Sequence, residues 1–285
     1  MKTIRRILLL LLAVGLVLAV VVYFREPKTP EEYFLAASKK MGTVSSMRFE
    51  MRMDMDGAIL MKPFAVDLSM EGEMTADPAM VHGTMKMGTG DSALTESELY
   101  METEGDESVT YIGTQVGGET QWISQRDTAD SKLGTDVQSG TIKLLELVNF
   151  LSDTEPEQIS ATELAFRGVI PSDKIQLAFQ IINILTQLRN AEWIDFDGLD
   201  EIAADLEDMP VVITVDTEEL VITGYELDMT GVMQEILRTS VEKSMDRLGL
   251  ALPDDELIEV GQVTAKIRLY DYDAVEEIRI PDSVR

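Results

Sequence analysis

The residue types that most often carry out chemistry in proteins are scarce in this chain. It contains no cysteine and a single histidine, His82. This composition excludes disulfides, thiolate metal sites, a cysteine nucleophile and metal sites built from several histidines. The sequence also lacks a nucleophile elbow, a phosphate-binding glycine loop and a metal-binding motif. We therefore expect neither enzymatic activity nor a cofactor, and we expect His82 to lie on the polar face of a strand.

Acidic residues dominate the charge, because 52 Asp and Glu against 24 Lys and Arg give a formal net charge of −28. Such a surface repels nucleic acid phosphates, so no binding to nucleic acid is expected. It suits a basic protein or peptide as a partner. The acidic segment 195–201 reads D-F-D-G-L-D-E and has two interpretations, a calcium site or a solvated loop. Its spacing does not fit an EF-hand loop, which favours the solvated loop.

Methionines recur at alternate positions near the start of the chain. Residues 47–56 read M-R-F-E-M-R-M-D-M-D, so apolar and charged residues alternate. A period of two predicts a strand with one apolar and one polar face. Flexible thioethers suit an irregular or variable apolar partner better than stiff side chains do. Thioether copper binding is a variant of this interpretation, but no cysteine or histidine cluster supports it.

The elements that would carry this apolar face are predicted strands. Twelve of the 17 methionines fall within residues 41–101. Turn residues separate short alternating runs, which is typical of an antiparallel meander with one apolar face. Tyr111 and Trp122 either pack in the core or lie on a ligand-facing rim. The predicted strands of this meander are 46–57, 63–76, 79–88, 94–103, 108–115 and 120–126.

Helices precede and follow this meander. Thr29 and Glu32 form a capping box that begins a helix over 30–41. A polar loop is predicted over 127–140, and a connector leads to Pro171. Strands, helices and strands without an intervening linker indicate one α+β domain. The further helices predicted are 141–151, 173–190 (capped by Ser172) and 230–248, and the further strands are 210–216, 219–228, 258–271 and 275–280.

The N-terminus has the pattern of a membrane signal. Three basic residues within positions 1–6 precede an uncharged apolar run over 7–24. Eighteen helical residues span about 27 Å, close to the roughly 30 Å of a bilayer's hydrocarbon core. We predict a single-pass anchor with a cytoplasmic tail, a linker at 25–29 and an extracellular domain over 30–285. A cleaved signal peptide is the alternative, although no small-residue cleavage site ends the run.

Three segments carry a resemblance to a known superfamily. They are L-A-A-S-K-K-M (35–41) leading into M-R-F-E-M (47–51), V-V-I-T-V-D (211–216) followed by G-Y-E-L-D-M-T (224–230), and L-Y-D-Y-D (269–273) followed by E-E-I-R-I-P (276–281). Together they resemble the LolA/LppX-like superfamily of extracytoplasmic lipoprotein and lipid carriers, over roughly residues 30–285, and are most similar to its Gram-positive branches. The resemblance implies an unclosed β-barrel whose apolar concave face is covered by helices.

The resemblance also implies a ligand. Acyl chains bind between the sheet and the helices in that superfamily, and many Gram-positive members are anchored through a lipidated cysteine, which this chain lacks. A transmembrane anchor in its place argues against free shuttling of cargo. We expect a lipid or other apolar ligand between the Met-rich sheet and the helices at 141–151 and 173–190. The alternative is a filled core with an acidic surface that binds a cationic partner. The candidate ligand-binding residues are Met51, Met53, Phe64, Leu68, Met70, Met85, Met101, Phe179 and Ile182.

Overall fold

The computed structural model describes residues 29–59, 62–90, 95–104, 107–116, 118–127, 149–150, 155–175, 206–247 and 258–284. These residues contain helices α2 (Pro30–Met41) and α6 (Thr230–Arg247) and a 3-10 turn, η2 (Ser172–Lys174). The strands are β1 (Ser46–Ile59), β2 (Lys62–Ala76), β3 (Ala79–Thr89), β4 (Thr95–Glu104), β5 (Glu107–Val116), β6 (Glu119–Asp127), β7 (Asn149–Phe150), β8 (Glu157–Gln158), β9 (Glu163–Ile170), β10 (Met209–Asp216), β11 (Val221–Asp228) and β12 (Ile258–Tyr270).

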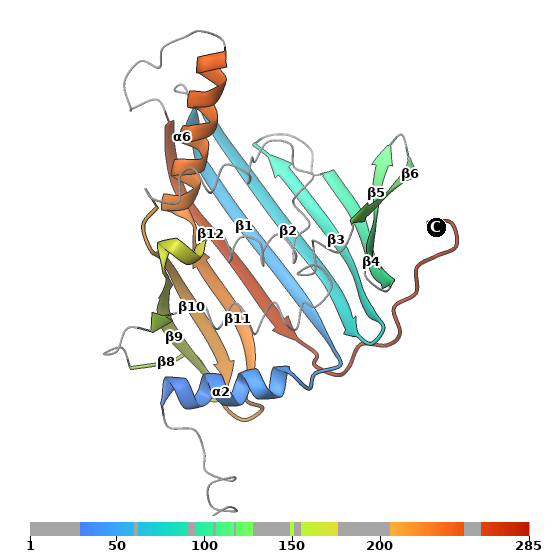
Figure 1. Ribbon diagram of the computed structural model, residues 1–285, viewed down its shortest axis with the longest axis vertical. Coiled ribbons are helices and arrows are strands. Elements are labelled where there is room, and N and C mark those ends of the chain that lie inside the picture. Colours follow the sequence, from blue (N-terminus) through green and yellow to red (C-terminus); the bar gives the residue numbers. More distant parts are fainter. Residues whose placement is uncertain are drawn as a thin grey trace, which may run out of the picture.

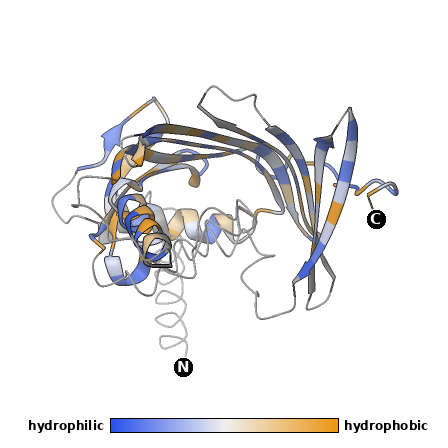
Figure 2. Ribbon diagram, turned by 90° about the horizontal axis from the view of Figure 1, so that it is seen from above, coloured by the Kyte–Doolittle hydropathy of each residue, from blue (hydrophilic) through white to orange (hydrophobic). Residues whose placement is uncertain are grey.

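All these strands belong to one antiparallel sheet. Its order is β6-β5-β4-β3-β2-β1-β12-β11-β10-β9-β7, and β8 pairs with β9. The sheet curves without closing, and both helices lie on its concave side (Figure 1 and Figure 2). This arrangement confirms the predicted α+β fold, an unclosed antiparallel half-barrel with helices on the concave face. Strands β1–β6 form the predicted meander, and β12 joins it to the second half of the sheet.

Alternation along β1 decides which face of the sheet becomes the core. Met47, Met51, Met53 and Met55 are buried, whereas the arginines and aspartates between them are exposed. The same pattern continues in β12, where Ala265 pairs with Met53 and is also buried. Because successive side chains of a strand point to opposite faces, one apolar set from β1 and β12 lines the concave side. The charged set faces solvent on the convex side.

Helix α6 is fixed to β12 by polar side chains as well as by apolar packing. The pairing of β1 with β12 shifts register between Met55 and Gly57. Near this irregularity, Gln234 donates a hydrogen bond from Nε2 to the carbonyl of Ile258 (2.8 Å) and accepts one at Oε1 from the Val260 amide (2.8 Å). A side-chain amide thus satisfies backbone groups of the strand. Buried residues of α6 pack on the concave face: Val232, Met233, Ile236 and Leu237.

Helix α2 lies near the second half of the sheet and contacts β11. Its predicted cap is confirmed, since the Thr29 hydroxyl accepts a hydrogen bond from the Glu32 amide at 3.2 Å. Ala37 and Met41 are fully buried, and the Tyr33 ring lies 5.9 Å from that of Phe166 in β9. The helix ends at Gly42, from which the chain turns into β1.

Several predicted elements differ from the structure. Residues 149–150, placed in a helix over 141–151, form β7, because they pair with Val169 and Gly168 of β9. The predicted connector before Pro171 contains β8 and β9. Ser172 is not the cap residue: Pro171 occupies that position, and the Ser172 amide donates to Asp208 at 2.9 Å.

Other predictions fall on parts of the chain that the structure does not describe. These are the anchor at 7–24, the acidic segment 195–201, residues 141–148 and 151 of the helix predicted over 141–151, and the helix at 173–190 beyond Ile175. Among the described residues, no helix combines the length and the apolar character needed to cross a membrane.

The last segment of the chain, predicted as a strand over 275–280, is not a strand. Residues 274–284, here called the C-terminal strap, run without regular secondary structure along the convex side (Figure 1 and Figure 2). Their buried side chains Ile278, Ile280 and Val284 pack on a second apolar cluster, separate from the main core. We call the sheet side of this cluster the outer patch: Met80, Tyr100, Val109, Tyr111 and Trp122.

Asp273, directly before the C-terminal strap, fixes the start of the strap. Its carboxylate accepts hydrogen bonds from the backbone amide (2.6 Å) and hydroxyl (2.8 Å) of Ser45. These bonds, from the amide first and then the hydroxyl, lower the pKa of Asp273 below its usual range. A lowered native pKa stabilises the fold above the unfolded value of about 4, and this stabilisation is lost as the pH falls through the native pKa.

The Asp273→Asn variant tests this contribution. We expect its thermal midpoint to lie slightly below that of the wild type at pH 7, because the charge that accepts both bonds is gone. The difference should shrink as the pH is lowered through about 4 toward 2, where the wild-type carboxyl becomes protonated. Thermal unfolding followed by circular dichroism at pH 7, 5, 3 and 2 measures it. A difference that stays constant across this range contradicts the assignment.

Candidate functional site

The methionine face predicted from the sequence lies on the concave side of β1–β4. The strand register places Met51, Met70 and Met85 in one row across β1, β2 and β3, and Met53, Leu68 and Met87 in the next row. Both rows join one core cluster. The structure therefore brings together the seven described candidate residues. Two further candidates, Phe179 and Ile182, lie outside the described residues. Of the seven, two are half-buried, Phe64 and Met85. The other five are buried: Met51, Met53, Leu68, Met70 and Met101.

Two glycines show how closely this face is packed in its centre. Gly72 and Gly83 pair directly across β2 and β3. A Cβ built on Gly72 would lie 2.8 Å from Cζ of Phe49, and one on Gly83 would lie 3.1 Å from the terminal methyl of Met70. The aromatic ring and the thioether therefore lie over the glycines. The protein's own side chains occupy this part of the concave face.

The concave face becomes polar toward β5, which the sequence analysis did not identify. Ser97 and Thr110 are buried, and they occupy inward positions on β4 and β5 beside Met85 and Met101. The hydroxyls of Ser97 and Thr114 lie 3.4 Å apart. Hydroxyls can both donate and accept hydrogen bonds, so this row offers polar contacts at the end of an apolar surface. The alternation of residues in the predicted strands 94–103 and 108–115 is the sequence pattern that could have identified these inward hydroxyl residues.

His82 lies on the convex face, as predicted, but it is half-buried and has partners. Its Nε2 lies 3.1 Å from Oε1 of Glu98, and its Nδ1 lies 3.7 Å from Oε1 of Glu73. The ring stacks on Tyr100 with centroids 4.4 Å apart. Burial, followed by the hydrogen bond that Tyr100 donates to Glu98 (2.8 Å), raises the pKa of Tyr100 to about 12. This cluster holds neighbouring strands together and contains no activated nucleophile.

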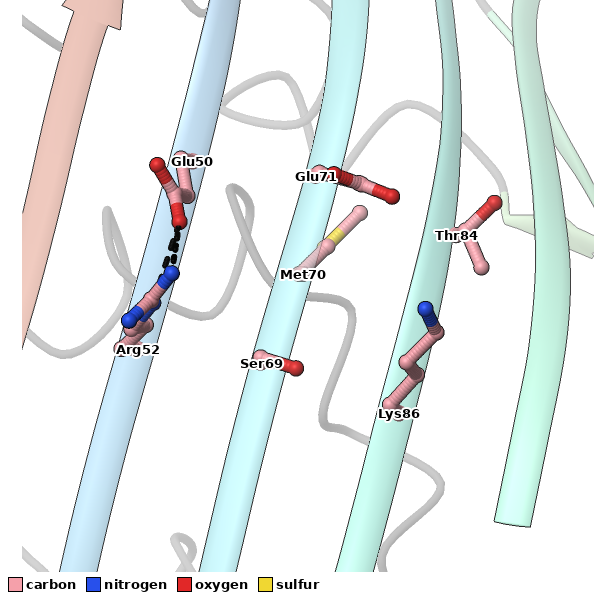
Figure 3. A pocket seen from close by; sticks show the side chains of 7 residues that line it. All are labelled: Glu50, Arg52, Ser69, Met70, Glu71, Thr84 and Lys86. Carbon is pink, nitrogen blue, oxygen red and sulfur yellow. Dashed lines mark hydrogen bonds and ion pairs between the residues drawn. The ribbon is translucent and has the colours of Figure 1, made fainter. Parts of the chain in front are cut away.

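A shallow recess of about 320 Å³ lies on the convex face over β1, β2 and β3 (Figure 3). Three of its four charged side chains have ion-pair partners, since Arg52 pairs with Glu50 at 2.5 Å and Lys86 lies 3.9 Å from Glu96. Such a surface suits water and ions rather than acyl chains. Among the described residues, no group of three or more His, Asp or Glu side chains is arranged to hold a metal ion. The recess lining is Glu50, Arg52, Ser69, Met70, Glu71, Thr84 and Lys86.

The fold and the apolar concave face define this domain as an open β half-barrel with helices on its inner side. Residues 29–153, less than half of the chain, match the model of a family of unknown function, DUF6612. No curated protein matches the chain. Among solved structures, LprF from Mycobacterium bovis aligns at 10% identity and a TM-score of 0.43, over 90% of this chain and 99% of that one. A DUF1329 family protein from Desulfovibrio piger aligns at 8% identity and a TM-score of 0.28, over 89% of this chain and 96% of that one.

Proposed function

We propose that this protein is a membrane-anchored extracytoplasmic binding protein that holds a lipid or another apolar ligand against the methionine-rich concave face. The observation that carries the proposal is the placement of the methionines. Strands β1–β4 direct nearly all of theirs to the inside of a sheet that stays open, rather than scattering them over both faces. Thioether side chains adapt to different shapes, which suits a surface that must fit acyl chains of different length.

Burial of apolar area would supply the binding energy. Each acyl CH₂ removed from water contributes about 0.8 kcal/mol. Rows of inward thioethers from Met53 to Met85 provide the apolar surface, and the hydroxyls of Ser97 and Thr110 provide hydrogen-bond partners for the polar end of the ligand. The resemblance to LolA/LppX-like carriers supports the same location. The predicted anchor at 7–24 would hold the protein at the membrane, so ligand would be received and released at one site instead of being carried away.

Ligand uptake tests the proposal. The protein purified from its host should contain lipid detectable by native mass spectrometry and organic extraction. It should also bind a fluorescent fatty acid in titration. Met85→Trp places a large ring in the half-buried edge of the concave face and should weaken fatty acid binding at least tenfold. Lys86→Trp, the matched control, adds the same ring one residue along β3 on the convex face and should leave binding unchanged.

The alternative hypothesis, a filled core, predicts the opposite result. The side chains of Phe49 and Met70 over Gly72 and Gly83 are the observation that favours it. Protein that is free of lipid after purification and takes up no fatty acid would favour this alternative. Equal binding by the Met85→Trp and Lys86→Trp variants would place the fatty acid elsewhere and contradict the proposed site.

A further inference from the structure

The C-terminal strap is attached to the convex face almost entirely by apolar side chains. Ile278, Ile280 and Val284 are buried against the outer patch, whereas the residues between them are exposed. The Val275 amide donates to the Ser46 hydroxyl at 3.2 Å. Among the described residues, hydrogen bonds of residues 276–284 run only within the strap, as from Arg279 to Glu277. The strap therefore occupies the outer patch without joining the sheet's hydrogen-bond ladder.

Charge does not favour this docking. The strap carries Glu276, Glu277 and Asp282 against Arg279, a net charge of −2, on a protein whose net charge is −28. Three carboxylates, Glu73, Glu98 and Glu102, occupy convex positions on β2 and β4 beside the outer patch, with Arg126 on β6 opposite Val109. Glu73 also lies 3.6 Å from Arg48, and Glu98 lies 3.1 Å from His82, so these two carboxylates are partly paired. Like charges on two docked surfaces weaken their association. An apolar segment of opposite charge would fit the same surface better.

The aromatic residues of the outer patch are oriented toward these carboxylates. The Tyr100 hydroxyl donates to Glu98 at 2.8 Å, and the Tyr111 hydroxyl donates to Glu102 at 3.0 Å. The rings of Tyr100 and Trp122 lie 5.8 Å apart. The patch thus has an aromatic floor with carboxylates at its border. This arrangement attracts lysine and arginine side chains through both ion pairing and cation–π contacts.

We propose that the outer patch is a binding site for an extended cationic segment of a partner protein, and that the C-terminal strap occupies this site until the partner displaces it. The recognised segment has apolar side chains at alternate positions, like Ile278 and Ile280, and lysine or arginine in place of the strap's acids. The site lies on the sheet face opposite the methionine surface, so the proposal does not depend on lipid binding.

A synthetic peptide tests the proposal on the full-length chain in non-ionic detergent. The probe is a fluorescent peptide of residues 274–285 with Glu276→Lys, Glu277→Lys and Asp282→Lys. The receptor is the Ile278→Ser, Ile280→Ser double variant, in which the strap has lost its apolar contacts. We expect the lysine peptide to bind at least tenfold more tightly than the native-sequence peptide, and at least tenfold more tightly to this variant than to the wild type. Its binding should weaken as salt increases.

Two controls separate the outer patch from non-specific charge attraction. A lysine peptide that also carries Ile278→Ser and Ile280→Ser should not bind. Adding Met80→Ala and Val109→Ala to the receptor should weaken binding at least tenfold, while adding Asp54→Asn, on the same face outside the patch, should not. Near-ultraviolet circular dichroism verifies that each receptor is folded. Equal binding of the native and lysine peptides, or retained binding without the isoleucines, overturns the proposal.

Displacement of the strap can be measured independently. Because the chain has no cysteine, an Ile280→Cys variant carries a single thiol, which is buried while the strap is docked. The lysine peptide should increase its rate of maleimide labelling several-fold, and the native-sequence peptide should change the rate much less. A labelling rate that the lysine peptide leaves unchanged, at concentrations that saturate the Ile278→Ser, Ile280→Ser receptor, shows that the strap is not displaced and overturns the proposal.

Discussion

Replacing Met53 with lysine is expected to lower the free energy of unfolding by about 4 kcal/mol or more, because it places an unpaired charge in an apolar core. Met53 is 5% exposed and pairs with Ala265 on one side and Leu68 on the other, so no carboxylate faces it across either strand. Urea unfolding monitored by circular dichroism gives the free energy. A Met53→Lys variant that fails to fold would also agree with the predicted loss of stability.

The matched control for this prediction lies one residue further along β1. Asp54 is exposed on the convex face and lies directly opposite Asp67 of β2, an unfavourable pair of like charges. Asp54→Lys converts this pair into an attractive one, worth about 0.2–1 kcal/mol. We therefore expect Asp54→Lys to be neutral or stabilising. Similar losses in both variants would show that β1 is not half-buried in the register described.

A methyl group at Gly72 is expected to destabilise the protein by about 3 kcal/mol, because the structure leaves no room for it. A Cβ at this position would overlap the carbonyl oxygen of His82 and lie 2.9 Å from Cα of Gly83. Both atoms belong to the backbone of β3, so they cannot move as a flexible side chain would. The Gly72→Ala variant, compared with the wild type by urea unfolding, measures the cost.

Gly231→Ala provides the contrast. Gly231 lies in the first turn of α6, and an added Cβ would meet no atom within 4 Å. Alanine restricts the unfolded chain more than glycine does, so this variant should be neutral or gain up to about 1 kcal/mol. A Gly72→Ala variant as stable as Gly231→Ala would show that β2 and β3 are further apart than described. It would also reopen the centre of the concave face as space for a ligand.

The alternation of apolar and polar residues in the sequence predicts much of the fold. The period of two in residues 47–56 predicts both β1 and the direction of its side chains, because a strand exposes alternate residues to opposite environments. The half-barrel is implied by the resemblance of local segments to a known superfamily, not by this alternation. The candidate residues on β1–β4 share one face, as expected, since register follows from the apolar pattern when one side of a sheet is buried.

Other elements needed the tertiary structure. β9 carries Leu164, Phe166 and Ile170 on one face, but Gly168 and Val169 interrupt the alternation, so the sequence predicts a connector there. Residues 149–150 end a segment whose apolar residues recur with a helical spacing, yet they pair with β9 on the side of that strand away from β10. Local propensity is a weak guide for such short segments, since pairing partners distant in sequence decide their conformation.

The C-terminal strap shows most clearly what alternation can determine. From Ile278 and Ile280 the sequence by itself determines an extended segment with one buried side, and this holds in the structure. It does not determine whether the backbone pairs with a strand, because a segment docked only through side chains has the same pattern. The tertiary structure places this segment over Tyr100, Val109 and Tyr111 on the convex face, and so creates a second apolar cluster opposite the methionine face. The physical reason is that periodicity reports which side chains leave water, whereas the surface that covers them depends on contacts between residues far apart in the chain.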